Sequence, residues 1–327
     1  MRNLNFIGWA RTLVAASALV WTISPAAAQK ISDRAITIVA PFTAGTGIDI
    51  VARVVAEELR KRWGQTVVVE NRPGASGVLG TQFVARAQPD GHTLLMTVNG
   101  HVINAAYFKN AAYAPVTSFA PISKVAIGSF MLAVHPKVPA KSAKEFVEYA
   151  KANPGKLNFS SPGIVTTHHV SMELFRLATG IDMVHVPSSG SAGAIRDLLG
   201  GEVQAMFIPI HVGLPLAQQG LIRALAVGSD TRSSLAPDIP TLAEQGIPGV
   251  NVDLWFALMA PAGTPPDLVT RYNKAVNEII STESVRELLA KQGLIAQGST
   301  PEALTALIGQ DFDRWATVLK NAGLREQ

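Results

Sequence analysis

Short, continuous apolar runs alternate along the chain with longer stretches in which apolar residues recur every three or four positions. The first three runs are residues 36–41 (ITIVAP), 66–70 (TVVVE) and 93–98 (TLLMTV), each bounded by polar residues or glycine. Such runs are typical of strands buried on both faces of a parallel sheet. We therefore predict strands there, and further strands at residues 130–134, 183–186, 203–208 and 223–227.

The stretches between these runs predict helices. Between the first two runs, apolar residues recur on one helical face (Ile50, Val51, Val54, Val55 and Leu59), while charged residues take the other (Glu57, Glu58, Arg60 and Lys61). Ser142 and Glu145 have the spacing of a capping box, which predicts another helix start. The repeated order of strand, helix and strand predicts an open, wound α/β sheet.

Residues 263–327 are predicted to be mostly helical. Thr264 and Thr300 each precede a proline, the usual arrangement of a capping threonine before a proline in the first turn. One apolar stripe runs along the last predicted helix, formed by Leu304, Leu307, Ile308, Phe312, Trp315, Val318 and Leu319. The sequence contains no internal repeat and no long linker, so two lobes would be joined by more than one crossing of the chain.

Residues 1–28 have the three-part form of a secretory signal peptide. Arg2 and Arg11 supply the basic start, residues 13–23 are apolar, and the small residues at 26–28 predict cleavage after Ala28. The apolar part is too short to span a bilayer comfortably, which argues against a membrane anchor. No later run of about 18 apolar residues follows, so we predict a mature protein without a membrane span.

Composition narrows the possible functions. The 327 residues include 28 Lys plus Arg and 24 Asp plus Glu, a net charge of +4; loss of Arg2 and Arg11 with the signal peptide leaves 26 against 24, or +2. A nearly neutral chain without a basic cluster predicts no nucleic-acid partner. The absence of cysteine excludes disulfides, thiolate metal sites, a cysteine nucleophile and a lipoprotein anchor.

The first candidate for binding chemistry is the segment 41–49 (PFTAGTGID), between a predicted strand and a predicted helix. Small residues let backbone amides approach a ligand there, and the start of a helix favours an anion. Asp49 already complements that helix dipole, so we expect it to cap the turn or face away. The glycines equally suit a tight turn without a ligand. The segment is neither a Walker loop nor a dinucleotide fingerprint.

The second candidate is the segment 159–169 (FSSPGIVTTHH), which also joins a strand to a helix, predicted at residues 170–178. The hydroxyls of Ser160, Ser161, Thr166 and Thr167 can either cap the helix or hold a small polar ligand. Both interpretations stay open on the sequence alone.

Two stronger chemical interpretations of this region are disfavoured. His169 and Glu173 share one helical face, but the third ligand of a metal site is missing, and we expect a surface or capping pair. Ser160, His169 and Asp182 could be drawn as a catalytic triad, yet no nucleophile elbow is present. The sequence therefore predicts neither a metal site nor an enzyme.

Ordered motifs along the mature chain resemble the Bug (TctC-type) family of periplasmic solute-binding proteins. Each motif is weak alone, and their number and order make the resemblance specific. The matching segments are Pro41–Gly45 with Asp49, Val67–Ala75, Pro89–Leu95, His185–Pro187, Gly190–Ser191, Asp197–Gly201, Ile239–Glu244, Trp255–Phe256, Ala260–Pro265 and Arg314–Trp315.

The resemblance implies a type II periplasmic binding protein fold, with two wound α/β lobes around a central ligand cleft. We expect residues 29–128 plus 253–327 in the first lobe and 129–252 in the second. The implied ligand is a small carboxylate, held by backbone amides, hydroxyls and water. The implied ligand-binding residues are Phe42, Thr43, Ala44, Gly45, Thr46, Asn99, Ser160, Ser161, Gly163, Thr166, Thr167, His169, Pro187, Ser188 and Gln204, with Gly100 and His101 as further cleft residues.

The same resemblance implies a periplasmic monomer that needs no cofactor and delivers its ligand to integral-membrane transporter subunits. A sensor subunit that presents ligand to a membrane receptor, or an enzyme on the same fold, are the alternatives. Some residues depart from the family pattern: Thr46 and Val165 replace glycines, Ser188 and Ser189 replace a Tyr-Lys pair, and Gln204 replaces an aspartate. These departures imply a ligand that differs from a plain C4 or C5 dicarboxylate.

Overall fold

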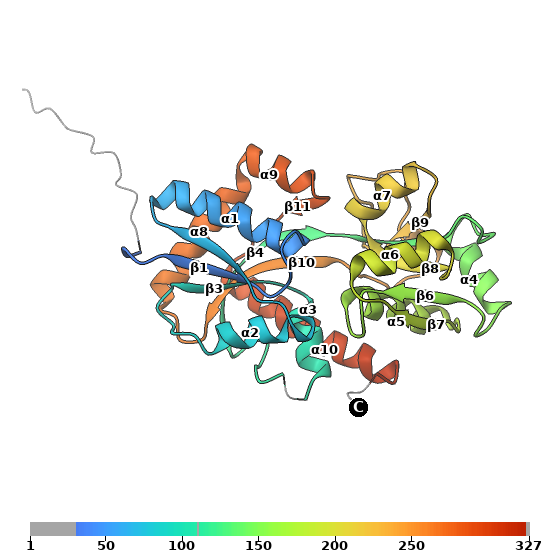
Figure 1. Cartoon of the computed structure of the whole chain (residues 1–327), viewed down its shortest axis with the longest axis horizontal. Coiled ribbons are helices and arrows are strands. Elements are labelled where there is room, and N and C mark those ends of the chain that lie inside the picture. Colours follow the sequence, from blue (N-terminus) through green and yellow to red (C-terminus); the bar gives the residue numbers. More distant parts are fainter. Residues whose placement is uncertain (1–30, 110, 325–327) are drawn as a thin grey trace, which may run out of the picture.

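The computed structural model describes residues 31–109 and 111–324, which form two β-sheets with helices on both faces of each (Figure 1). The predicted signal peptide at residues 1–28 lies outside the described residues. Ten α-helices and eleven strands are found in the described part of the chain. No helix among these residues has the length and apolar character needed to cross a bilayer.

The first sheet has six strands in the order β11-β4-β10-β3-β1-β2. Strand β1 pairs in parallel with β2 and β3, whereas β10 lies antiparallel between β3 and β4, and β11 lies antiparallel to β4. The strands are β1 (Ile36–Ala40), β2 (Val67–Asn71), β3 (Thr93–Val98), β4 (Phe119–Gly128), β10 (Leu254–Pro261) and β11 (Leu294–Ala296).

The second sheet has five strands in the order β7-β6-β8-β5-β9. Strand β6 pairs in parallel with β7 and β8, and β5 is antiparallel to β8 and β9. The strands are β5 (Phe130–Val134), β6 (Asn158–Ser161), β7 (Val184–Pro187), β8 (Ala205–Pro209) and β9 (Arg223–Val227). The chain crosses between the sheets at Ser129 and returns through residues 228–253.

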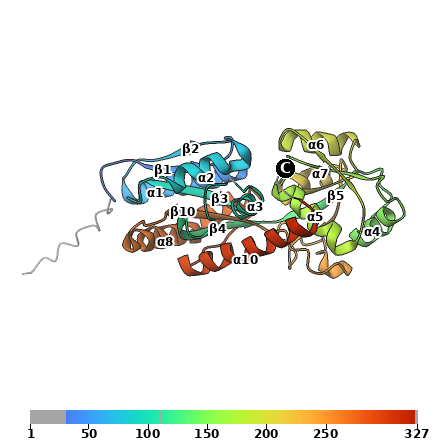
Figure 2. The same cartoon turned by 90° about the horizontal axis from the view of Figure 1, so that it is seen from below.

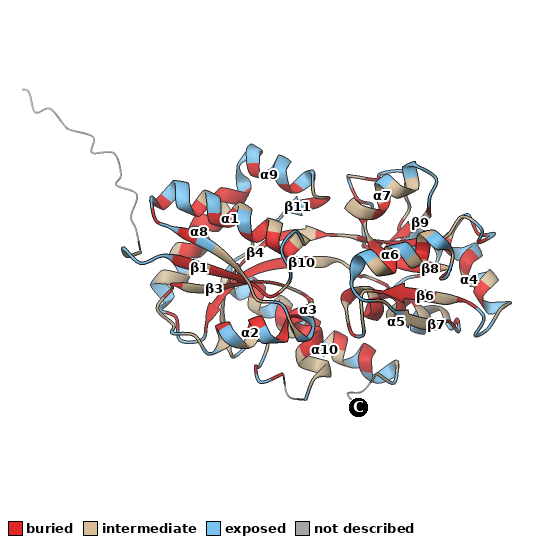
Figure 3. Cartoon of the chain, viewed as in Figure 1, coloured by how far each residue is buried: buried red, intermediate tan, exposed pale blue. Residues whose placement is uncertain are grey.

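Helices cover both faces of the first sheet because its strands alternate their apolar side chains (Figures 1 and 3). On β1, Ile36 and Ile38 face the cluster that includes α1 and α8, and Val39 faces the cluster that includes α2, α3 and α10. The helices are α1 (Gly47–Trp63), α2 (Val78–Ala85), α3 (Gly100–Tyr107), α8 (Pro266–Ser281), α9 (Glu283–Ala290) and α10 (Pro301–Asn321).

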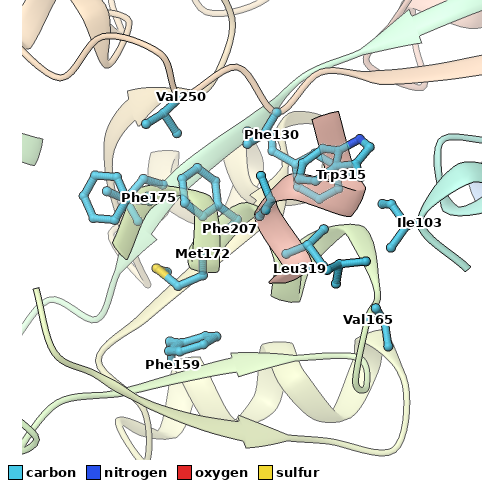
Figure 4. Close-up of a cluster of buried hydrophobic side chains, with 14 of the residues drawn as sticks. Ile103, Phe130, Phe159, Val165, Met172, Phe175, Phe207, Val250, Trp315 and Leu319 are labelled. Atoms are coloured by element: carbon cyan, nitrogen blue, oxygen red, sulfur yellow. The ribbon is translucent and has the colours of Figure 1, made fainter. Parts of the chain in front are cut away.

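The second sheet is covered in the same way, and one of its apolar clusters continues into the first unit. Its helices are α4 (Ala143–Lys151), α5 (Thr167–Thr179), α6 (Ser191–Gly200) and α7 (Ile210–Gln218). Phe130 and Phe207 of this sheet belong to the same cluster as Ile103 of α3 and Trp315 of α10 (Figure 4). Helix α10 thus reaches along both units, as Figure 2 shows from below. Burial of a large side chain such as Trp315 contributes about 2–3 kcal/mol.

The element predictions are confirmed in part. Strands β3, β5 and β9 have the predicted bounds, and Thr300 caps α10 by accepting the Ala303 N–H at 3.2 Å. Both sheets, however, are mixed rather than parallel, and β2 is a partly exposed edge strand. Thr264 does not cap α8: its hydroxyl donates to the Pro261 carbonyl at 2.8 Å, and Pro265 occupies the cap position. Strands β4, β10 and β11 were not predicted.

A strained turn follows β2. Gly74, Ala75, Ser76 and Gly77 all have positive φ, with Ser76 at 54°. Left-handed backbone costs a non-glycine residue about 1 kcal/mol or more. We expect Ser76→Gly to raise the free energy of unfolding by about 0.5–1 kcal/mol in urea titrations. Ser191→Gly, at an ordinary helix start, is the control and should lower it; equal effects of the two changes would contradict the strain at Ser76.

Candidate functional site

The turn between β1 and α1 is held by hydrogen bonds within itself. Gly45 has φ +82°, and its N–H donates to Asp49 Oδ2 at 2.9 Å. Thr46 stands at the N-cap of α1 with no side-chain cap bond, because its hydroxyl donates to the Thr43 carbonyl at 2.8 Å. The first amides of α1 are therefore not capped by a side chain and can receive an anion.

The turn between β6 and α5 repeats this geometry. Val165 has φ +58°, and its N–H donates to His169 Nδ1 at 3.1 Å. Thr166, at the N-cap of α5, makes no cap bond, and its hydroxyl donates to the Gly163 carbonyl at 2.8 Å. The two turns correspond position by position, although the sequence shows no repeat. Thr46 matches Thr166, and Asp49 matches His169.

Asp49 caps and fixes the first turn, one of the two roles that the sequence predicted for it. Its side chain is buried, and its oxygens accept hydrogen bonds from Gly45, Arg53 and Asn71. Burial alone would raise the pKa of this carboxyl, but the bonds from Arg53, Gly45 and Asn71 outweigh it and hold the pKa below its usual range. The Asn71 amide also donates to the Phe42 carbonyl at 3.1 Å, so one network positions the whole turn.

His169 has the corresponding role in the second turn. Because Nδ1 accepts the Val165 N–H, the ring proton belongs on Nε2, which lies 3.7 Å from Glu173 Oε1. Burial, with the neighbouring His185 and Arg176 as smaller causes, lowers the pKa of His169 to about 3. The ring stacks on that of His185 with centroids 3.7 Å apart. The His169–Glu173 pair is buried, so the prediction of a surface pair is wrong and that of a capping role is right.

Nearly every hydroxyl among the predicted site residues donates its proton within the protein. Ser161 bonds both the Gly163 carbonyl and His185 Nε2, and Ser188 bonds the Asp197 carboxylate. Thr167 donates to Asn99 Oδ1 at 3.2 Å. A hydroxyl has one proton, so these groups retain only acceptor lone pairs for a further partner. In this arrangement they offer no proton to a carboxylate, and backbone amides are the remaining donors in the two turns.

Several predicted residues are brought together around the second turn. The loop after β7 lies beside it, because the Ser188 N–H donates to the Ser161 carbonyl and the Gly190 N–H to the Pro162 carbonyl, at 2.9 and 3.2 Å. Pro187 ends β7 at this edge of the sheet. In the first turn Phe42 is half-buried, and Thr43 and Ala44 are exposed. Asn99 joins the two regions, since it follows β3 and contacts Thr167 at the start of α5.

Other predicted residues are placed elsewhere. Gln204 precedes β8 and bonds the Asn158 N–H, at the end of the sheet opposite to the turn that follows β6. The buried Ser160 hydroxyl donates to the Ala194 carbonyl of α6, not to His169, and Asp182 is 63% exposed, so the described contacts form no triad. His101 lies inside the first unit, bonded to the Pro115 carbonyl and stacked on Tyr113. These placements leave the two turns as the candidate site.

Sequence reasoning missed a polar network where the chain crosses between the sheets. Asp253 accepts hydrogen bonds from Ser229 at 2.6 Å and Ser129 at 3.2 Å, and burial raises the pKa of its carboxyl despite these bonds. Asn99 Nδ2 donates to the Asp253 carbonyl at 3.2 Å. Ser129, Ser229 and Asp253 are single residues that belong to no recognisable motif, so the sequence alone could not predict this network.

The described residues include no group of three or more histidine, aspartate or glutamate side chains that could hold a metal ion. Two cavities of about 460 Å³ are lined by residues outside both turns. One is lined by β9 and neighbouring residues, including Arg223, and the other by β2 and α1, including Val68 and Arg53. Neither includes a predicted site residue.

Comparison with known proteins places the chain among transport receptors. Residues 51–324 match the family model TctC, described as the tripartite tricarboxylate transporter family receptor. The solved structure of the periplasmic binding protein BugD is 35% identical, with a TM-score of 0.79, over 90% of this chain and all of that one.

Two further solved structures are similar and have a named ligand. One is a protein from R. palustris with adipate, 33% identical over 89% of this chain and 97% of that one, with a TM-score of 0.80. The other is MatC from Rhodopseudomonas palustris with bound malate, 33% identical over 88% and 99%, with a TM-score of 0.77. The chain therefore has the two-lobed fold of periplasmic binding proteins, as predicted.

Proposed function

The chain belongs to the TctC family of tripartite tricarboxylate transporter receptors, and from this membership we propose that it captures a small organic carboxylate in the periplasm. The family consists of solute-binding receptors, and two similar proteins hold adipate and malate. Both of these ligands are small dicarboxylates. We assign the present chain to the same chemical class of ligand.

The matched pair of βα turns is the observation that carries this proposal. Each turn ends in a helix whose first amides are uncapped by a side chain, and each has its threonine hydroxyl turned back to a carbonyl. Amides at a helix start favour a negative group. Two such turns, one from each lobe, suit a ligand with a carboxylate at each end.

The proposed ligand contacts are chosen by whether the polar groups of each residue already form hydrogen bonds within the protein. We retain residues 42–46 of the first turn, Gly163 and Thr166 of the second and the neighbouring Pro187. Ser160 and Gln204 are left out, because their polar groups serve α6 and β6. Ser161, Ser188 and His169 are assigned to holding the second turn in shape, because their polar atoms already serve other groups.

The proposed lobes are residues 29–128 plus 253–327 and residues 129–252, with the ligand cleft between them. Sheet membership supports this division, since strands β1–β4, β10 and β11 form one sheet and β5–β9 the other. In Figure 1 the start of α1 points toward the second sheet's unit. We propose that ligand closes the lobes about Ser129 and residues 228–253.

We further propose that residues 1–28 are cleaved on export and that the mature protein acts as a monomer without a cofactor. It would deliver its ligand to integral-membrane transporter subunits and catalyse no reaction. Family membership supports the transport role over the sensor and enzyme alternatives.

A ligand series tests the carboxylate assignment. We expect adipate or malate to raise the melting temperature of the purified protein, since a ligand that binds only the folded state stabilises it; 100-fold saturation contributes about 2.7 kcal/mol. Adipamide, the neutral diamide of adipate, is the matched control and should have no effect. Stabilisation by adipamide as large as by adipate, or none by any of a panel of mono-, di- and tricarboxylates, would contradict the proposal.

A further inference from the structure

Asn99 stands at the start of α3, where its backbone carbonyl accepts the N–H groups of Val102 and Ile103 but its side chain does not cap the helix. An asparagine at this position usually accepts an N–H of the first turn through its side chain. Here the side chain makes no cap bond and is fully buried. It must therefore make its hydrogen bonds elsewhere, since a buried amide without partners is costly.

Both polar atoms of the Asn99 side-chain amide form hydrogen bonds with residues that lie far away in the sequence. Oδ1 accepts the hydroxyl proton of Thr167, the first residue of α5 in the second lobe, at 3.2 Å. Nδ2 donates to the carbonyl of Asp253, at 3.2 Å, where the chain returns to the first sheet. One side chain thus connects the first lobe, the returning crossing and the helix that follows the second turn.

The two chain segments that cross between the lobes are joined to each other by hydrogen bonds at Asp253, which Asn99 contacts. The Asp253 carboxylate accepts from Ser129 in the outgoing crossing and from Ser229 in the returning one, and these two hydroxyls lie 2.8 Å apart. Any rotation of the lobes about these segments changes the distance from Asn99 to Thr167. The position of α5 relative to the first turn therefore depends on this bond.

From these contacts we infer that Asn99 is a positioning residue: it sets the second βα turn opposite the first by bonding Thr167 and the Asp253 carbonyl, without touching the ligand. The inference rests on the proposed function for its effect on binding. The hydrogen bond between Asn99 and Thr167 also joins the lobes in the unliganded protein, so this part of the inference does not depend on the ligand. Asn99 and Thr167, predicted from the sequence as ligand contacts, take this role instead.

The test compares Asn99→Leu and Thr167→Val with a matched control. Asn104→Leu is that control, because Asn104 lies on the same helix, is buried, and donates to the Ser76 carbonyl within the first lobe. Because the chain has no cysteine, spin labels can be attached at Lys61→Cys and Lys144→Cys, two exposed positions in different lobes. Pulsed electron spin resonance then reports the distance between the lobes.

We expect Asn99→Leu and Thr167→Val each to broaden or shift the distance distribution of the unliganded protein and to lower the affinity for adipate and malate by the same factor, about 10-fold. The double variant should be no weaker than Asn99→Leu alone, because the one bond that Thr167→Val removes is already lost in Asn99→Leu. Thr167→Ser, which keeps the hydroxyl, should restore both readouts. Asn104→Leu should leave both unchanged.

Unchanged distances and affinities in Asn99→Leu and Thr167→Val would overturn the inference. A loss in Thr167→Val that differs between adipate and malate would overturn it too, because it would indicate direct contact with the ligand. If the unmodified protein binds no carboxylate, the proposed function fails, and the distance distributions still decide the role of Asn99.

Discussion

At pH 5 the protein is expected to be less stable to unfolding than at pH 7.5, by up to about 8 kcal/mol. Burial is the main cause that lowers the pKa of four histidines, to about 4 for His101 and His185 and about 3 for His168 and His169. In the unfolded chain a histidine titrates near pH 6.5. Between these values only the unfolded chain takes up the protons, so stability falls as the pH falls from about 6.5 toward 4.

Buried carboxyls offset part of this loss. Each histidine that stays neutral in the folded protein removes about 1.4 kcal/mol per pH unit below its unfolded pKa, or about 8 kcal/mol for four at pH 5. Burial raises the pKa of Glu173, Asp253 and Asp311, so the folded protein takes up protons there before the unfolded chain does. These carboxyls therefore increase the free energy of unfolding as the pH falls. The net loss of stability is smaller than the loss caused by the histidines alone.

Urea titrations followed by circular dichroism between pH 7.5 and 5 measure this dependence. The slope of the unfolding free energy against pH counts the extra protons bound by the unfolded chain. His168→Gln should reduce that slope by about one proton, whatever it does to the absolute stability, because desolvation lowers the pKa of His168 to about 3 in the folded protein. Because the buried carboxyls act in the opposite sense, the variant is the decisive measurement: a slope in His168→Gln equal to that of the unmodified protein would show that His168 titrates alike in both states.

Replacing Asp49 with alanine is expected to lower carboxylate affinity by about 100-fold, or about 2.7 kcal/mol, and to cost about 2 kcal/mol of folding stability. The change removes the acceptor for Gly45, Arg53 and Asn71 at once. Arg53 is 54% exposed, so the ion pair itself contributes little, and the loss comes chiefly from the orphaned Gly45 and Asn71 donors. Without the Asp49 carboxylate, the hydrogen bonds that hold Gly45 and Asn71 in this turn are lost, and we expect the turn to change its conformation.

Asp90→Ala is the matched control for this prediction. Asp90 also accepts a backbone N–H, from His92 at 3.0 Å, and an arginine, Arg34 at 2.7 Å, but it lies outside both turns. It should lower stability while leaving affinity unchanged in isothermal titration with adipate. Wild-type affinity in the Asp49 variant would remove the first turn from the site.

The sequence predicts those strands whose signal is local. Residues 93–98, 130–134 and 223–227 are mostly apolar runs, and β3, β5 and β9 have these bounds. Strand β4 contains Pro121 and Lys124, which dilute its apolar run; Pro121 is tolerated because the pairing with β10 is irregular there. The antiparallel placement of β10 depends on partners far away in the sequence, so no local pattern could predict it.

The two turns were found from small residues between a strand and a helix, and ordered motifs along the chain, one of them in the first turn, gave the family. What those residues do could not be predicted as well. A hydroxyl such as that of Thr166 looks like a ligand donor until the Gly163 carbonyl is seen to accept its proton. Asn99 looks like a ligand contact until Thr167 and Asp253, 68 and 154 residues away, are seen to bond it.

Strand β10 also determines the order in which the chain can assemble. It lies between β3 and β4, so the first sheet stays divided into two incomplete pieces until residues 254–261 are available. The second sheet has all five strands within residues 130–227 and can close without any later segment. Pairing of strands that are distant in sequence is slow, because the intervening loop must be ordered first. The N-terminal third of this protein thus completes its sheet after the middle third, and a nascent chain presents its first lobe unfinished until β11 (Leu294–Ala296), about nine-tenths of the way along, has emerged.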